Sequence, residues 1–211
     1  MKKFIFVILF CFALTAAFAE NTIFALKTEE KTILCTQFES GISFFIDLPS
    51  DATNYSDFGN SILISCDDGT MLIYGQVELS SFLSKNKMKK ETDDEKLLEY
   101  YKWEKNYQTT EGMTFKKEIE ITNTENVNYG YYKFYTNVNV DEIKDIDTVA
   151  IEGIAFIKNN YAVYVNKMIS KIQNEDESKK VLLNAFSNLK VTTDKFLDNS
   201  EESWNMYDSL K

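Results

Sequence analysis

The sequence predicts an α+β fold: a single domain of mostly antiparallel β-sheet, with a helical insertion and a C-terminal amphipathic helix packed on the sheet. Three observations lead to this fold class. Apolar runs of strand length recur in pairs separated by turn residues, a segment of helical period interrupts them, and a second such segment follows the last pair. The chain has 211 residues, of which 44% are hydrophobic, enough for one domain with a sizeable core.

Two hairpins are predicted in the first part of the chain. In Ile62–Leu79, the residues Asp67-Asp68-Gly69 separate two apolar runs. An Asp-Gly pair at such a place signals a hairpin, because type I′ turns need positive φ at their central residues. A second hairpin is expected from Thr32–Phe38 and Gly41–Leu48, and a short strand over Thr22–Leu26 precedes it.

The next segments are a polar loop and the helical insertion. Pro49 ends the preceding strand, so Pro49–Asn60 is expected to be a loop. Helical period begins near Ser80, and Thr92-Asp93-Asp94-Glu95 has the form of a capping box, which predicts a helix that starts at Asp93. One face of this helix carries apolar side chains from Leu97, Leu98 and Tyr101.

A basic cluster lies between these two segments. We interpret it as a solvated linker, because acidic residues follow it at once, and contact with an anionic partner is the alternative. The cluster consists of Lys85, Lys87, Lys89 and Lys90.

Further strands follow the helix. Met113–Thr122 alternates between apolar and polar residues, as a half-buried antiparallel strand does. Tyr129–Val138 is rich in aromatic residues. Thr148–Lys158 and Tyr161–Ile169 form a third hairpin around Asn159-Asn160, since asparagine tolerates positive φ.

The C-terminal helix is predicted from its cap and its apolar stripe. Asn174 is its expected N-cap, and acidic residues follow in the first turn. The stripe to be buried is Val181, Leu182, Ala185, Phe186 and Leu189. Residues 192–211 read as a polar acidic tail or a weak extra helix, so the α+β domain is predicted to span residues 20–191.

The first 19 residues have the three parts of a secretory signal peptide. Lys2-Lys3 is the basic region, Phe4–Phe18 is the apolar region, and Ala17-Phe18-Ala19 is an A-x-A cleavage site. We therefore expect cleavage after Ala19 and export to the periplasm or the outside of the cell. No later stretch is apolar enough to predict a membrane span in the mature chain.

The composition argues against several functions. Histidine is absent, and all 23 basic residues are lysine, so no His-containing catalytic triad and no arginine fork for phosphate can exist. With a net charge of −10, the chain is not expected to bind nucleic acid. Nothing in the sequence indicates a cofactor.

Three sets of residues are candidates for a site or a bond. Cys35 and Cys66 are an even pair in an exported chain, which predicts a disulfide, with two buried free thiols as the alternative. Four acids in one loop have ligand types that suit calcium, but not the spacing of an EF-hand, so we interpret the loop as solvated. They are Asp141, Glu142, Asp145 and Asp147, and no metal site is predicted.

The third set is a row of aromatic residues on one face of a strand: Tyr129, Tyr131 and Tyr135. If no helix covers that face, the row is a platform for a ligand, peptide or glycan. The interpretation that we prefer is that helices cover both faces of the sheet, since aromatic residues are common in ordinary strands.

The segment Phe44–Asp51 reads FFIDLPSD, an apolar strand that ends at a proline before a polar loop. Together with the order of elements from Ile42 to Val191, it resembles the PsbP/DcrB-type families. Their usual tryptophan after the proline is missing here, where Ala52 and Thr53 follow. The resemblance implies an antiparallel sheet flanked by helices and a non-catalytic accessory or binding role, and it implies no site residue.

The function hypothesis that we favour is an exported, non-enzymatic binding or accessory protein of the cell envelope. Its partner would be an envelope protein or a small ligand. A carboxylate-dependent hydrolase acting on glycan or cell wall and a surface-exposed interaction protein are the alternatives. The absence of histidine and of a catalytic spacing of carboxylates favours the first hypothesis.

Overall fold

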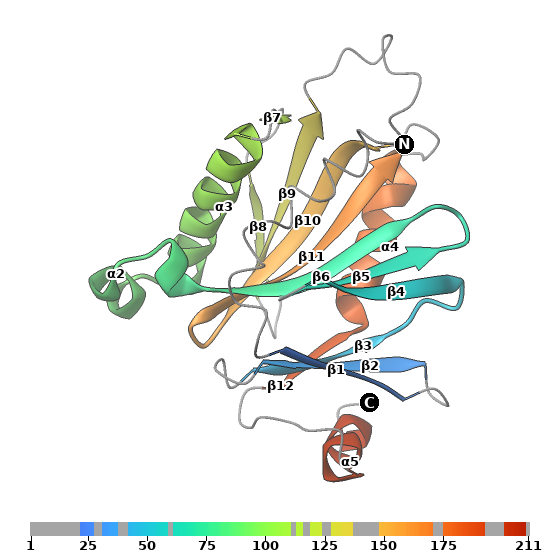
Figure 1. The fold of residues 1–211 in the computed structure, drawn as a ribbon. Coiled ribbons are helices and arrows are strands. Elements are labelled where there is room, and N and C mark those ends of the chain that lie inside the picture. The colour runs from blue at the N-terminus through green and yellow to red at the C-terminus, as the bar shows by residue number, and fades with distance from the viewer. Residues whose placement is uncertain are drawn as a thin grey trace.

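The structure is a computed structural model, and it describes residues 22–27, 31–37, 42–58, 61–110, 113–115, 119–123, 128–136, 148–170, 175–192 and 201–209. The predicted α+β fold with antiparallel sheets and few helices is confirmed (Figure 1). The predicted signal peptide and the predicted acidic loop of residues 141–147 lie outside the described residues. Among the described helices, none is long and apolar enough to span a membrane.

The larger of the two sheets has eight strands in the order β4-β5-β6-β11-β10-β9-β7, and β8 also pairs with β9. Every pairing in it is antiparallel. In sheet order the strands are β4 (Ala52–Phe58), β5 (Ser61–Cys66), β6 (Met71–Glu78), β11 (Tyr161–Ser170), β10 (Thr148–Lys158), β9 (Asn128–Thr136) and β7 (Met113–Phe115), with β8 (Glu120–Asn123) beside β9.

The smaller sheet has four strands in the order β1-β2-β3-β12, and its pairings are also antiparallel. Its strands are β1 (Thr22–Lys27), β2 (Thr32–Gln37), β3 (Ser43–Asp47) and β12 (Leu189–Thr192). The predicted hairpin of β2 and β3 is confirmed. β12 lies late in the sequence and β1 to β3 lie early, so the smaller sheet brings together segments that are far apart along the chain.

The layers follow from which side chains each element buries (Figure 1). Helix α3 (Asp93–Thr110) covers one face of the larger sheet. Helix α4 (Glu175–Ser187) and the smaller sheet cover its other face, and α5 (Glu201–Ser209) covers the outer face of the smaller sheet. A sheet that lies between two layers buries both faces, which explains the unbroken apolar runs in β2 and β3.

The turns of two predicted hairpins have the backbone that they need, with one difference in turn type. Asn159 has a φ of 52°, as expected between β10 and β11. Between β5 and β6 only Gly69 has positive φ, at 82°. The Gly69 amide donates to the Cys66 carbonyl at 3.1 Å, so this turn has a left-handed residue at its end, instead of the two in the middle that type I′ requires.

The helical insertion begins with the 3₁₀ turn η2 (Leu79–Ser81) and α2 (Lys85–Lys90), which contains the predicted basic cluster. Its lysines are solvent-exposed, but they form a helix and not a linker, and Ser84 caps it by accepting from the Lys87 amide. The predicted capping box of α3 is confirmed: the Thr92 amide donates to Glu95 Oε2 at 2.7 Å, and the Glu95 amide donates to Thr92 Oγ1 at 3.3 Å.

Several local predictions differ from the structure. The expected polar loop after Pro49 contains strand β4. Of the predicted strand Met113–Thr122, the described strand residues lie in β7 and β8, which both pair with β9. Leu98 and Val181 are exposed, although each was expected on a buried stripe. The segment expected as a tail contains α5, in agreement with the alternative of an extra helix, and Tyr207 of α5 is buried.

Candidate functional site

The face of the larger sheet under α4 contains a buried row of charged side chains. Lys133 on β9 lies directly opposite Glu152 on β10, and Glu152 lies opposite Lys167 on β11. We call these three residues the ionic row. Residues directly opposite on neighbouring strands point to the same face, so register alone brings the three side chains together.

The carboxylate of Glu152 is the centre of the hydrogen bonds in the ionic row. Lys133 Nζ lies 3.0 Å from Glu152 Oε1, and the Tyr131 hydroxyl donates to the same oxygen at 3.0 Å. Ser178, in the first part of α4, donates to Glu152 Oε2 at 2.9 Å and accepts from Lys167 Nζ at 2.8 Å. The sheet and the helix are therefore joined by polar contacts in an otherwise apolar layer.

Burial removes the three charged groups of the ionic row from water, which costs free energy. Glu152 and Lys167 are each only 1% exposed, and the side chain of Lys133 is 8% exposed. Burial lowers the pKa of Lys167, while the negative charge of Glu152 opposes that shift. One carboxylate thus faces two ammonium groups in a poorly solvated layer, and each charge depends on the others.

The predicted tyrosine platform lies beside the ionic row, and α4 contacts two of its three residues. The ring of Tyr129 packs on Phe186 of α4 with 5.3 Å between centroids. Lys179 of α4 places its ammonium 4.2 Å from the centre of the Tyr131 ring, and Lys133 lies 5.1 Å from that of Tyr135. Side chains of α4 therefore lie against Tyr129 and Tyr131.

The network of Ser178, Lys167 and Glu152 contains the residue types of an activated nucleophile, but not its geometry. A nucleophilic serine needs a base that takes its proton and a route to substrate. Here Lys167 donates to Ser178 instead of accepting from it, and Ser178 is buried. The hydroxyl orients two charged partners, which is a structural role.

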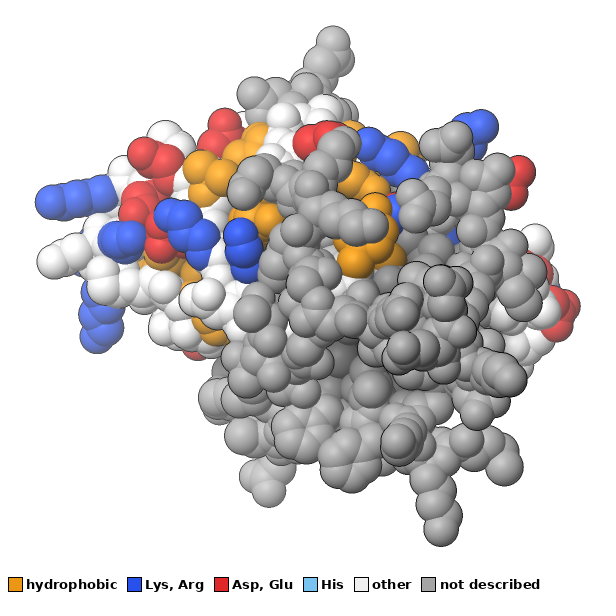
Figure 2. All heavy atoms as spheres, turned by 90° about the horizontal axis from the view of Figure 1, so that it is seen from above, with side chains coloured by type: hydrophobic (Ala, Val, Ile, Leu, Met, Phe, Trp, Pro, Cys, Tyr) orange, Lys and Arg blue, Asp and Glu red, His pale blue; other side chains and the backbone are white. Residues whose placement is uncertain are grey.

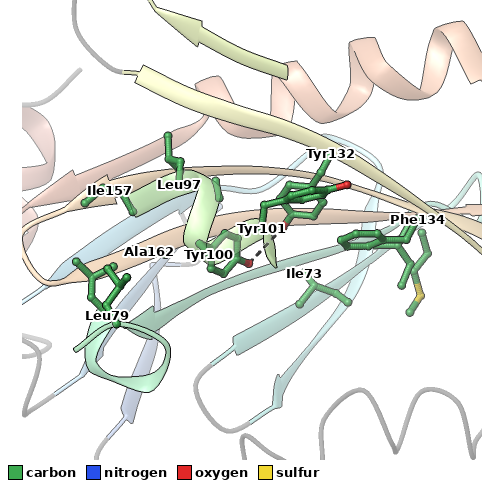
Figure 3. Packing of buried hydrophobic residues seen from close by; sticks show 13 residues of the cluster. Ile73, Leu79, Leu97, Tyr100, Tyr101, Tyr132, Phe134, Ile157 and Ala162 are labelled. Atoms are coloured by element: carbon green, nitrogen blue, oxygen red, sulfur yellow. Dashed lines mark hydrogen bonds between the residues drawn. The ribbon is translucent and has the colours of Figure 1, made fainter. Parts of the chain in front are cut away.

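The opposite face of the larger sheet, under α3, carries a second buried polar group, which we call the tyrosine cluster. It contains Tyr100 and Glu104 of α3, Tyr132 of β9 and Tyr164 of β11. The hydroxyls of Tyr100 and Tyr132 lie 3.3 Å apart, as the dashed line in Figure 3 marks. Apolar side chains surround these residues, among them Leu97 and Phe134 (Figure 3).

Two glycines make room for the tyrosines of this cluster. A Cβ at Gly153 would overlap the ring of Tyr132, which crosses β10 so that its hydroxyl donates to Asn166 Oδ1 at 2.7 Å. A Cβ at Gly75 would overlap Tyr164, whose hydroxyl shares a hydrogen bond of 2.8 Å with Ser61 Oγ. Each glycine lets one tyrosine cross the glycine's own strand and reach a polar partner on the strand beyond it.

Glu104 differs from Glu152 because no ammonium group balances it. Gln108 Nε2 donates to Glu104 Oε1 at 2.8 Å. Burial raises the pKa of Glu104 to about 7, and the hydrogen bond from Gln108 opposes the shift only in part. The two buried carboxylates of the larger sheet and its helices therefore differ in charge balance, and they lie on opposite faces.

The two cysteines lie in different sheets, Cys35 in β2 and Cys66 in β5. Both are buried free thiols in the structure, which differs from the predicted disulfide. The chain changes sheet between β3 and β4, so the two strands that carry the cysteines are not hydrogen-bonded neighbours. Burial raises the pKa of the Cys66 thiol to about 11, and the carboxylates of Asp51 and Asp68 add to the shift.

Within the described part of the chain, no group of three metal-ligating side chains comes together.

The exposed lysines of α2 are also not a purely basic surface. Lys87 pairs with Glu91 at 3.6 Å and with Glu99 at 3.2 Å. Figure 2 shows basic and acidic side chains interspersed at the side of the molecule where α2 lies.

Sequence reasoning did not single out Glu152, Lys167, Ser178 or Glu104. A signal for two of them was present, because Glu152 and Lys167 each interrupt an otherwise apolar strand, TVAIEGIAFIK and YAVYVNKMIS. A charge in such a run must find a partner on a neighbouring strand. Glu104 carried no such signal, because charged residues surround it along α3.

Neither a protein-family model nor a curated protein sequence matches the chain. Several solved structures are similar to it, among them two with low sequence identity. One, a crystal structure from Bacteroides thetaiotaomicron VPI-5482, has a TM-score of 0.40 and 12% identity, and the match covers 71% of this chain and 45% of that one. Another is the solution structure of cyanobacterial PsbP (CyanoP) from Synechocystis sp. PCC 6803, with a TM-score of 0.43 and 8% identity, covering 82% of this chain and 93% of that one.

Proposed function

We propose that this chain is an exported, non-enzymatic binding or accessory protein of the cell envelope. The observation that carries the proposal is the placement of the two carboxylates that are buried among the described residues. Glu152 lies under α4 and Glu104 lies on α3, on opposite faces of one sheet. A carboxylate-dependent glycan hydrolase needs two carboxyl groups that face a common substrate, and this pair is separated by the sheet itself.

The surface that we assign to partner binding is the edge strand β4. It lies at one edge of the larger sheet. Tyr55 in its middle is 43% exposed, the largest exposed fraction among the big apolar side chains of the described residues. An edge strand offers unpaired backbone groups to another chain, and an exposed tyrosine adds a site for its side chains. An extended segment of an envelope protein fits this edge.

The first experiment tests binding in the native host. A photo-crosslinking amino acid is placed at position 55, and in matched controls at positions 98 and 181, which are also exposed apolar sites but lie on α3 and α4. We expect one discrete adduct with an envelope protein from position 55 and none from the controls. Equal adducts from all three positions, or none from any, would overturn the assignment to β4.

A second experiment tests export and catalysis separately. The intact mass of the protein from the native host should correspond to a chain that begins at Glu20, as the predicted signal peptide requires. Purified protein should release no sugar from cell-wall glycan. Turnover that Glu152→Gln or Glu104→Gln abolishes, with Glu120→Gln as the exposed control, would instead support the hydrolase.

A further inference from the structure

Helix α3 is attached to the larger sheet through one face, and Glu104 lies on that face. Tyr100, Glu104 and Gln108 follow one another at helical spacing of four residues, so they point to the same side. All three are buried against the sheet. A carboxyl group therefore lies in the contact between helix and sheet, where an apolar side chain would be expected.

The groups that face Glu104 are neutral. On its own helix they are Tyr100 and Gln108, and from the sheet they are Tyr132 of β9 and Tyr164 of β11. Burial raises the pKa of each tyrosine hydroxyl, and the charge of Glu104 adds to the shift. From β10 the face turned to α3 presents only apolar side chains, and β7 contains no titratable residue. Among the described residues, no lysine contributes to the pKa of Glu104, so burial dominates its shift.

The hydrogen bond from Gln108 favours the ionised form of Glu104, but the same side chain also carries a buried acceptor that a protonated carboxyl group could satisfy. Gln108 donates to Glu104 through Nε2, while its own Oε1 is buried and accepts no hydrogen bond from any residue that the structure describes. A carboxylate has no proton to give to that oxygen. A protonated Glu104 supplies the missing donor once the Gln108 amide turns over, and an unsatisfied buried acceptor is costly.

We propose that Glu104 is a proton-controlled contact between α3 and the larger sheet. With the carboxyl group protonated, α3 is seated on the sheet. When the group ionises, the charge must be hydrated or must leave the layer, so α3 loosens and the tyrosine cluster beneath it becomes accessible. This inference does not depend on the proposed function, because Glu104 lies on α3, whose main sheet contacts are with β9, β10 and β7, and not on the edge strand β4.

The direction of the pH effect follows from linkage. The pKa of Glu104 in the folded protein, about 7, lies above the ordinary value of 4.5 that holds in the unfolded chain. The stabilisation from this group is then fully present below pH 4.5 and is lost as pH rises through about 7. Alkaline conditions loosen α3, and mildly acidic conditions seat it.

The test uses Trp103, the neighbour of Glu104, as a reporter. Its ring packs on Phe82 and Tyr100 with centroid distances of 5.8 Å and 6.1 Å. Since the chain has 2 tryptophans, Trp204→Phe leaves Trp103 alone. Fluorescence is followed from pH 5 to 9 in this background, with Glu104→Gln as the test variant and Asp93→Asn, an exposed acid at the start of α3, as the matched control.

We expect a transition with a midpoint near pH 7 in the reference protein and in the Asp93→Asn variant, and no transition in the Glu104→Gln variant. A transition that persists in the Glu104→Gln variant, or none in the reference protein, would overturn the proposal. Two measurements need no variant at position 104. The carboxyl carbon shift of Glu104 should titrate near pH 7, and amide exchange, corrected for intrinsic rates, should accelerate in α3 and not in α4; joint acceleration of both helices would contradict the proposal.

Discussion

At the scale of single residues, the molecule depends on a few polar groups that the register of the strands forces into apolar layers. Glu152 is the clearest case, because Lys133, Tyr131 and Ser178 all contact its carboxylate. Such a network is stable only when each member has its partner, since a buried charge without one is costly. The consequences for stability are therefore asymmetric: loss of the carboxylate affects two ammonium groups at once.

Replacement of Glu152 by alanine should lower the free energy of unfolding by about 3–5 kcal/mol at neutral pH, the cost of removing one partner from a buried ion pair. Urea unfolding measures this change. Glu120→Ala is the control, because its pair with Lys179 is exposed at 43% on both side chains, and the expected loss is below about 1 kcal/mol. Similar losses of unfolding free energy in the two variants would mean that the charges of the ionic row stabilise the protein no more than an exposed ion pair does.

Gly153→Ala should also destabilise the protein, by roughly 1–3 kcal/mol, because the new methyl group overlaps the ring of Tyr132. The same substitution in a Tyr132→Ala background should cost less, since the ring that causes most of the overlap is gone. A double-mutant cycle by urea unfolding gives the coupling. If the two losses simply add, the crossing of Tyr132 over Gly153 is not what requires glycine at this position.

At the scale of elements, α5 shows how little sequence is needed to attach a helix. Tyr207 is 3% exposed, packs on Phe45 at 5.1 Å, and donates a short hydrogen bond to Asp47 Oδ1. Trp204 packs on the same phenylalanine at 5.8 Å. Two aromatic residues in a polar segment make no recognisable stripe, which is why the sequence predicts a tail here.

Deletion of residues 193–211 should therefore lower the melting temperature, contrary to what a solvated tail would do. Tyr207→Ala alone should cost on the order of 2–4 kcal/mol, because it removes a buried ring and the hydrogen bond to Asp47. Asp208→Asn, at an exposed position of the same helix, is the control and should have little effect. Calorimetry that finds the truncated chain as stable as the full chain would show that α5 is not attached in solution.

At the scale of the whole molecule, two carboxyl groups, the half-buried Asp47 and the buried Glu104, give stability opposite dependences on pH. Burial pushes the pKa of Asp47 upward, but hydrogen bonds from Lys190, Tyr207 and Thr32 outweigh it and lower that pKa below its ordinary 3.8. Its stabilisation is present above pH 3.8 and is lost as pH falls through the lower, folded-state pKa. For Glu104 the pH dependence is the opposite, because its stabilisation is lost as pH rises through about 7.

Stability should accordingly be highest in mildly acidic solution. On the alkaline side, the loss attributable to Glu104 is on the order of 3 kcal/mol for a shift of this size. Urea unfolding between pH 3 and 9 measures the profile, and Glu104→Gln should flatten its alkaline side while Asp47→Asn flattens its acidic side. A profile that neither substitution changes would assign the pH dependence to other groups.

The sequence predicts most of the elements but not how they are shared between sheets. The cap at Thr92, the turn at Asn159 and the hairpin around Gly69 are local signals that the structure confirms, although the turn type at Gly69 differs from the predicted one. Strand β4 is missed because an exposed edge strand of polar residues has no alternating pattern. The ionic row is missed for a different reason: it requires the register of three strands, which no single segment contains.

The pairing of β12 with β3 has a consequence for the order of folding. Lys190 and Asp47, which bind each other at 2.8 Å, are separated by 143 residues along the chain. The smaller sheet is therefore complete only after the last strand has been synthesised, and contacts between such distant segments form late and slowly. Until then β3 has an open edge, so we expect a chaperone that binds extended apolar segments to recognise the unfinished chain at Ser43–Asp47.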